Sequence, residues 1–168
     1  MVTVLVVVES SFGNTMEVAQ LVAAALGGRD RVCVVGADTA PVLLPPDVDL
    51  LLVGAPTHAF TLPTPTSRTQ ATLKGAAPAA ETGVREWAAR LAVRPGLRVV
   101  TFDTSVRLRL SPGCAAKAAR RLLRRRGFTD VERGPSFFVT GTPGPLADGE
   151  RERATQWGRQ LASGLALH

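Results

Sequence analysis

The sequence has no tyrosine and only two cysteines, Cys33 and Cys114. Two cysteines are too few for a disulfide framework, and no group of cysteines and histidines has the spacing of zinc ligands. We therefore expect no metal site and, by default, a reducing cytoplasmic location. No signal peptide is expected either, because the chain opens on a strand-like apolar run without a basic leader or a small-residue cleavage site.

Long apolar runs are also absent. No stretch approaches the roughly 20 residues that are needed to span a bilayer, so no membrane segment is predicted. The hydrophobic fraction of 45% nevertheless rules out wholesale disorder, and a chain of 168 residues suits one sizeable core. With no internal repeat and no shift in composition, residues 1–168 are predicted to form a single domain.

Acidic residues are in the minority, and the chain carries a formal net charge of +6. The densest basic run, residues 120–126, closes a predicted helix, where cations face the negative end of the helix dipole. A solvated helix face and a surface for an acidic partner both remain open. No aromatic residue interleaves with these arginines, so a base-stacking surface, and with it a nucleic-acid partner, is not expected.

The sequence does contain a regular alternation of strand-like and helix-like segments. Strand-like runs occur at residues 2–8, 32–35, 50–54 and 97–102. The run at 2–8 is nearly all β-branched and that at 50–54 is continuous rather than alternating, which is typical of parallel strands that are buried on both faces. Apolar residues at helical spacing mark residues 18–26, 84–91, 115–123 and 154–165. With a fifth strand near the end of the chain, this order predicts an α/β fold with a doubly wound, five-stranded parallel sheet.

The fifth strand is predicted from Val131 and residues 137–139, with Gly134 and Pro135 interrupting the pattern. Proline cannot donate a ladder hydrogen bond and is therefore confined to edge strands or bulges. We expect this strand at the edge of the sheet.

The helix before the fifth strand is predicted to begin at Ser111, a plausible N-cap, with Pro112 as its first residue. Cys114 would then lie in the first turn, where the helix dipole lowers the pKa of a thiol. Two roles remain open for Cys114: a redox thiol, or a small residue that fits a tight helix start.

Residues 61–80 do not fit the alternation. They are rich in proline, threonine and alanine and show no clear period. Structureless loops of this length are uncommon in compact domains and are often lids or binding loops. A lid over a binding site and a disordered insertion are the two interpretations left open.

In open α/β sheets, ligands bind beyond the carboxyl ends of the strands. The loop after the first strand has hydroxyl groups on Ser10, Ser11 and Thr15 that can donate to anionic oxygens. Gly13 lets the backbone turn close to a ligand, and the N–H groups of Gly13, Asn14 and Thr15 would lie at the positive end of a helix. The pattern is typical of a phosphate site; a tight capped turn without a ligand is the alternative.

These residues resemble the phosphate loop of the flavodoxin family, which reads Ser/Thr-x-Thr-Gly-x-Thr. Ser10, Gly13, Asn14 and Thr15 match it, and Phe12 replaces the usual threonine. The resemblance implies a flavodoxin-like fold with strand order 2-1-3-4-5 and bound FMN. It assigns the phosphate of FMN to six residues: Ser10, Ser11, Phe12, Gly13, Asn14 and Thr15.

The stretch from Gly54 to His58 is similar to the family segment that lines the isoalloxazine ring. By this resemblance the ring would be bordered by Pro56, Thr57, His58, Ala59 and Phe60. The loop after the fourth strand would add Asp103, Thr104 and Ser105. Both loops lack the family's usual aromatic residues, which leaves His58 or Phe60 to stack on the ring. His58 is equally open to a structural role, and no catalytic residue is assigned.

Other doubly wound classes are disfavoured, because neither a G-x-G-x-x-G fingerprint nor a P-loop motif is present. Three functions remain. The first is an FMN-binding electron carrier or small flavin oxidoreductase, working with a redox partner protein or a small-molecule acceptor. The second is an NAD(P)H-dependent quinone-type reductase, with a nicotinamide site in residues 61–80. The third is a binding module that has lost FMN. The sequence decides neither whether the chain is an enzyme nor its oligomeric state.

The charge of the chain adds an expectation about any bound flavin. Arg107 and Arg109 lie near the predicted third loop. Positive charge stabilises a reduced, anionic ligand. We therefore expect a bound flavin that is not a strong one-electron reductant.

Overall fold

The computed structural model describes residues 1–28 and 31–166. Its elements in chain order are β1 (Thr3–Val8), α1 (Asn14–Leu26), β2 (Arg31–Gly36), β3 (Leu50–Pro56), α2 (Pro65–Leu73), α3 (Val84–Arg90), β4 (Arg98–Val106), α4 (Ala115–Arg126), β5 (Val131–Val139) and α5 (Glu150–Leu165).

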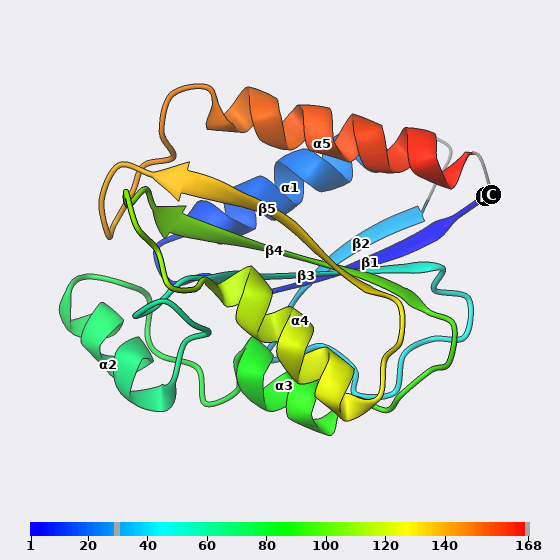
Figure 1. Cartoon of the computed structure of the whole chain (residues 1–168), viewed down its shortest axis with the longest axis horizontal. Coiled ribbons are helices and arrows are strands. Elements are labelled where there is room, and N and C mark those ends of the chain that lie inside the picture. Colours follow the sequence, from blue (N-terminus) through cyan, green and yellow to red (C-terminus); the bar gives the residue numbers. More distant parts are fainter. Residues whose placement is uncertain (29–30, 167–168) are drawn as a thin grey trace.

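Within the described residues the strands form one parallel sheet in the order β2-β1-β3-β4-β5 (Figure 1). The predicted doubly wound sheet and its strand order are confirmed. Strand β1 pairs with β2 on one side and with β3 on the other, so the direction of winding reverses next to β1. The loops that follow β1 and β3 therefore meet at the switch point, where such sheets bind ligands.

Helices cover both faces of the sheet: α1 and α5 lie on one face, and α3 and α4 lie on the other (Figure 1). Each face has its own apolar core, with Trp87 and Leu123 in one and Val22 and Phe137 in the other. Burial on both faces explains why β1 and β3 are continuous apolar runs rather than alternating ones. None of the helices in the described residues is long and apolar enough to cross a membrane.

Strand β5 lies at the edge of the sheet, as its proline predicted. It is continuous rather than interrupted, because the register with β4 shifts between Thr101 and Asp103 and leaves an extra residue on β5. Gly134 and Pro135 occupy this bulge. A Cβ atom on Gly134 would lie 2.5 Å from the carbonyl oxygen of Thr101, so only glycine fits there without a shift of the backbone.

The predicted start of α4 is wrong by several residues. The helix begins at Ala115, with Cys114 as its N-cap, rather than at Ser111 and Pro112. The hydroxyl of Ser111 instead donates to the carbonyl of Gly113, which closes a local turn before the helix. A capping acceptor comes from elsewhere in the fold, since the Asp103 carboxylate accepts the N–H of residue 116 at 2.8 Å.

Residues 61–80 contain a helix that the sequence analysis missed, so they are not a wholly disordered insertion. Helix α2 begins with a capping box: the Thr64 hydroxyl accepts the N–H of Ser67, and the Ser67 hydroxyl accepts the N–H of Thr64. Pro65 occupies the first helical position. The helix has no apolar stripe, because Arg68 and Ala71 are its buried residues. That is why periodicity did not reveal it.

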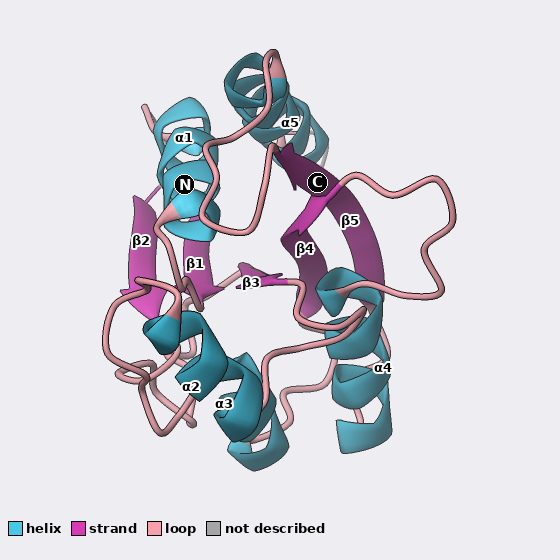
Figure 2. Ribbon diagram, turned by 90° about the vertical axis from the view of Figure 1, so that its left-hand side faces the viewer, coloured by secondary structure: helices cyan, strands magenta, loops and turns pink. Residues whose placement is uncertain are grey.

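Helices α1 and α5 lie side by side over one face of the sheet (Figure 2). They approach closely at Gly158 of α5, where an added Cβ atom would lie 2.7 Å from the Cβ of Ala25 and 2.8 Å from the carbonyl oxygen of Val22. A glycine at this position therefore sets the spacing of the two helices.

The variant Gly158→Ala is expected to lower the free energy of unfolding by about 1–3 kcal/mol, because the methyl group overpacks the contact with α1. Gly164→Ala in the same helix is the matched control, because nothing lies within 4 Å of its Cβ position. It should be neutral or stabilising by up to about 1 kcal/mol through helix propensity. Urea unfolding measures the free energy of unfolding of both variants. Equal changes would show that Gly158 is not needed for the close contact between α1 and α5.

Candidate functional site

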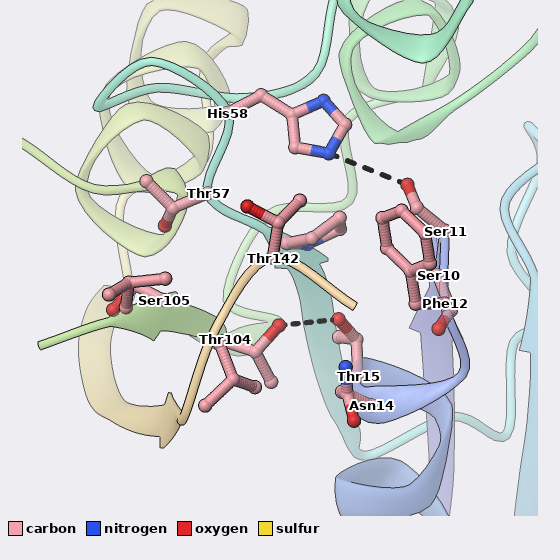
Figure 3. Close-up of a pocket in the computed structure, with 13 residues that line it drawn as sticks. Ser10, Ser11, Phe12, Asn14, Thr15, Thr57, His58, Thr104, Ser105 and Thr142 are labelled. Atoms are coloured by element: carbon pink, nitrogen blue, oxygen red, sulfur yellow. Dashed lines mark hydrogen bonds between the residues drawn. The ribbon is translucent and has the colours of Figure 1, made fainter. Parts of the chain in front are cut away.

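The carboxyl ends of β1, β3 and β4 meet at one edge of the sheet, the edge that faces the viewer in Figure 2. A pocket of about 80 Å³ opens there (Figure 3). It brings together ten of the residues that were predicted to bind a cofactor: Ser10, Ser11, Phe12, Asn14, Thr15, Pro56, Thr57, His58, Thr104 and Ser105. Their polar hydroxyl, amide and imidazole groups make it a site for a hydrogen-bonding ligand.

Four predicted residues lie outside the lining of this pocket. Gly13 is the N-cap of α1, in the left-handed conformation with a φ of 93°. Ala59 and Phe60 also have positive φ and form a tight turn; Ala59 lines an adjoining hollow, whereas Phe60 is 44% exposed. Asp103 is fully buried beneath α4. The structure therefore leaves His58, and not Phe60, beside the pocket.

The loop after β1 presents free donors at the amino end of α1. The Ser10 hydroxyl accepts the N–H groups of Gly13 at 3.1 Å and Met16 at 3.3 Å. The N–H groups of Asn14 and Thr15 have no acceptor among the described residues. Two free N–H groups at the positive end of a helix are what an anionic oxygen needs.

The back wall of the pocket is a buried pair of hydroxyls. Thr15 of α1 and Thr104 of β4 lie 2.8 Å apart, oxygen to oxygen (Figure 3). Both residues are almost fully buried, at 1% and 4% exposure. The pair fixes the first turn of α1 against the sheet, and with it the direction of the free N–H groups.

The chain after β5 closes the pocket from a side that the sequence analysis missed. Thr142 lines the pocket together with Val106 and Val139. The segment is held in place by Asn14, whose amide donates to the carbonyl of Pro143 at 3.3 Å. The sequence could have indicated these residues, because the loop after β5 leaves the same carboxyl end of the parallel sheet as the other loops of the site.

His58 connects the pocket to α2. Its Nε2 atom lies 3.4 Å from the Ser11 hydroxyl, and its Nδ1 atom lies 2.9 Å from the hydroxyl of Ser67 (Figure 3 shows the first contact). Burial lowers the pKa of His58 below its ordinary value of 6.5, and the charges of Arg68 and Lys74 lower it further. The imidazole is therefore neutral at pH 7 and can accept or donate a hydrogen bond at the pocket.

A buried ion-pair cluster holds α2 beside the pocket. The guanidinium of Arg68, with a side chain 5% exposed, lies 2.8 Å from Glu9 at the end of β1 and 2.6 Å from Glu86 of α3. Glu9 also accepts the N–H of Val84 at 2.9 Å. Burial would lower the pKa of Arg68, but the hydrogen bonds and charges of Glu9 and Glu86 raise it above its ordinary value. One cation thus links β1, α2 and α3.

Cys114 does not have the lowered pKa that the sequence predicted. Burial raises the pKa of its thiol, and the nearby Asp103 carboxylate raises it further. The N–H of Lys117 and the charge of Arg133 act in the opposite direction but are smaller. A protonated thiol beside a buried carboxylate fits a small residue at a tight helix start better than a reactive thiolate.

No protein-family model matches the sequence, and no curated protein matches it. Solved structures do. A flavodoxin from the domain Archaea superposes with a TM-score of 0.61 at 16% identity, covering 98% of this chain and 99% of that one. The chain has a flavodoxin-like fold.

Two further structures share the flavodoxin-like fold. Oxidised flavodoxin 2 from Bacillus cereus matches with a TM-score of 0.56 at 15% identity, covering 98% of this chain and 97% of that one. A WrbA-like flavodoxin from Agrobacterium tumefaciens matches with a TM-score of 0.55 at 16% identity, covering 100% and 99%. At these identities the likeness concerns the fold, so the chemistry of the site is argued from this chain's own residues.

The variant Arg68→Leu is expected to lower the free energy of unfolding by about 3–5 kcal/mol, because it leaves the Glu9 carboxylate buried without its partner. Arg31→Ala, which removes the exposed ion pair with Asp47, is the matched control and should cost less than about 1 kcal/mol. Urea unfolding of both variants checks this. A loss for Arg68→Leu as small as the control's would contradict the structural role of the cluster.

The lowered pKa of His58 predicts a pH dependence of stability. Between pH 6.5 and the lower pKa of the folded state, the unfolded chain binds a proton that the folded chain does not. The free energy of unfolding should therefore fall as the pH drops from 7.5 towards 5, and His58→Asn should remove part of this slope. The free energy of unfolding is measured against pH for the unmodified protein and for His58→Asn. The same slope in both would show that the pKa of His58 is not lowered by folding.

Proposed function

We propose that the chain binds FMN through the loop of residues 10–15 and acts in electron transfer or as a small flavin oxidoreductase. The observation that carries the proposal is the pair of free N–H groups on Asn14 and Thr15, at the switch point of a flavodoxin-like sheet. A phosphate at this position would also receive the hydroxyl proton of Ser10, whose oxygen already accepts two N–H groups. Each hydrogen bond to a charged group contributes roughly 1.5–3 kcal/mol, so no arginine is required.

The residues on the ring side of the site fit a flavin less closely than the phosphate loop does. The pocket of about 80 Å³ is much smaller than the roughly 300–1,000 Å³ of ordinary small-molecule sites. A second hollow of about 210 Å³ adjoins it and shares Thr57, His58 and Thr142 as lining residues. We expect the ring to occupy both spaces once the side chain of Thr142 turns aside.

FMN, when bound, would supply the redox chemistry, and the protein would position it and set its surroundings. Lys74 lines the second hollow, and its charge, with that of Arg68, acts on His58. Positive charge at this end favours an anionic ligand. His58, neutral and held by Ser67, can direct one ring nitrogen at the ligand.

The basic run of α4 bears on the choice of partner. Arg120 and Arg126 donate to the backbone carbonyls of residues 131 and 91 and so belong to the fold. Arg121, Arg124 and Arg125 are exposed and form no ion pair with the described residues. A redox partner protein, if acidic, would meet these three cations; a small-molecule acceptor would not need them.

The direct test compares FMN with riboflavin, which lacks the phosphate. FMN fluorescence should be quenched at micromolar protein, whereas riboflavin should bind more weakly by a factor of ten or more, about the value of one charged hydrogen bond. Ser10→Ala should reduce FMN binding and leave riboflavin binding nearly unchanged. Ser105→Ala, in the same pocket but on β4, is the control for a general loss of the pocket.

Two outcomes would contradict the proposal. Equal binding of FMN and riboflavin would show that the loop does not hold the phosphate. No quenching at high protein concentration would favour the binding module that has lost FMN. With FMN bound, bleaching on anaerobic addition of NADPH would distinguish a reductase from an electron carrier.

A further inference from the structure

A second cavity, of about 560 Å³, lies between β5 and the segment that leads into α4 (Figure 2 shows these elements). Its volume is within the range of ordinary small-molecule sites, roughly 300–1,000 Å³. Ser105 and Val106, at the end of β4, line both this cavity and the first pocket. The two therefore adjoin at the end of one strand.

The cavity is lined by three cations, Lys117, Arg133 and Arg153, and by no carboxylate. Arg153 is engaged with Glu150 and with the carbonyl of Ser136. The side chains of Lys117 and Arg133 form no hydrogen bond and no ion pair with any other described residue. Two of the three charges are thus uncompensated within the described part of the chain.

Two acidic groups near the cavity are engaged with other groups and form no ion pair with Lys117 or Arg133. Asp103, whose charge acts on the lining residue Cys114, is buried and accepts the N–H of residue 116. Glu150 is also buried and accepts the N–H of Phe138 in addition to pairing with Arg153. Like charges that line one concave wall raise its positive potential and attract anions.

Neutral donors and a flat apolar wall complete the cavity. Ser105 and Ser136 line it, and their hydroxyls form no hydrogen bond with other described residues. Phe138 forms one wall, and the guanidinium of Arg107 lies 4.2 Å from the centre of its ring. This places a fourth cation beside the cavity.

We propose that this cavity binds the phosphate group of a small phosphorylated molecule. A phosphate dianion matches two free cations, and its oxygens accept from guanidinium, ammonium and hydroxyl donors together. A single carboxylate would leave one cation unmatched. The site is separate from the loop of residues 10–15 and does not depend on whether FMN binds there.

The test is a titration of the isotope-labelled full chain with inorganic pyrophosphate at constant ionic strength, followed by amide NMR shifts. Pyrophosphate should shift the amides of residues 113–117 and 133–136. The double variant Lys117→Ala/Arg133→Ala should weaken that binding by a factor of about ten or more, as expected for lost charged hydrogen bonds. Arg121→Ala/Arg124→Ala, which removes the same charge from the exposed face of α4, is the matched control and should change it by less than about threefold.

Several results would overturn the proposal. Equal weakening in the control variant would reveal a general charge effect. Shifts confined to residues 10–15 would assign pyrophosphate to the first loop alone, which supports the proposed FMN site but not this one. No shift at 10 mM pyrophosphate, about the weakest affinity of interest, would exclude the site. Equally tight binding of citrate at these residues would show an anion site that is not selective for phosphate.

Discussion

The buried guanidinium of Arg68 connects the parts of the molecule from which the site is built. It pairs with Glu9, which directly follows β1, and with Glu86, in the first turn of α3. Because Arg68 and Ser67 are neighbours in α2, the same cluster also positions Ser67 for its hydrogen bond with His58. The Nε and Nη2 atoms of Arg68 are paired with the two carboxylates, whereas Nη1 is buried without a hydrogen-bond partner among the described residues. Removing one partner of a buried ion pair is strongly destabilising, so the cluster holds β1, α2 and α3 together. Helix α2 has no apolar stripe of its own, and this ion-pair cluster takes the place of ordinary apolar packing.

The two halves of the site differ in how far they are prepared for a ligand. At the loop of residues 10–15, the N–H groups of Asn14 and Thr15 are free and the Thr15–Thr104 pair fixes their direction. Little rearrangement would be needed there, which favours affinity. At the other end, His58 and a turn that points Phe60 into solvent replace the expected aromatic wall. The residues of the loop therefore offer a more complete set of contacts for an anion than the surrounding side chains offer for a ring.

Positive charge recurs on both sides of the end of β4. On one side the charges of Arg68 and Lys74 add to the effect of burial and lower the pKa of His58; on the other, Lys117 and Arg133 face a cavity without a carboxylate. The same end of the sheet carries the amino ends of α1 and α4, which add their dipoles to these charges. Positive charge therefore gathers at the carboxyl end of the sheet in two places, which share the end of β4.

The sequence by itself predicted the strands and the doubly wound parallel sheet, because strand runs are local patterns, and its resemblance to the flavodoxin family implied the strand order. The phosphate site at residues 10–15 was predicted in the same way from a local pattern of hydroxyl residues and a glycine turn. Pro135 even placed β5 at the edge, since a missing ladder donor is a property of one residue. Other features needed the tertiary structure. The start of α4 depends on Asp103, a carboxylate from another strand, and α2 depends on Glu9 and Glu86. Thr142 and the basic cavity likewise arise where segments distant in sequence meet, and such contacts leave no periodic signal in the chain.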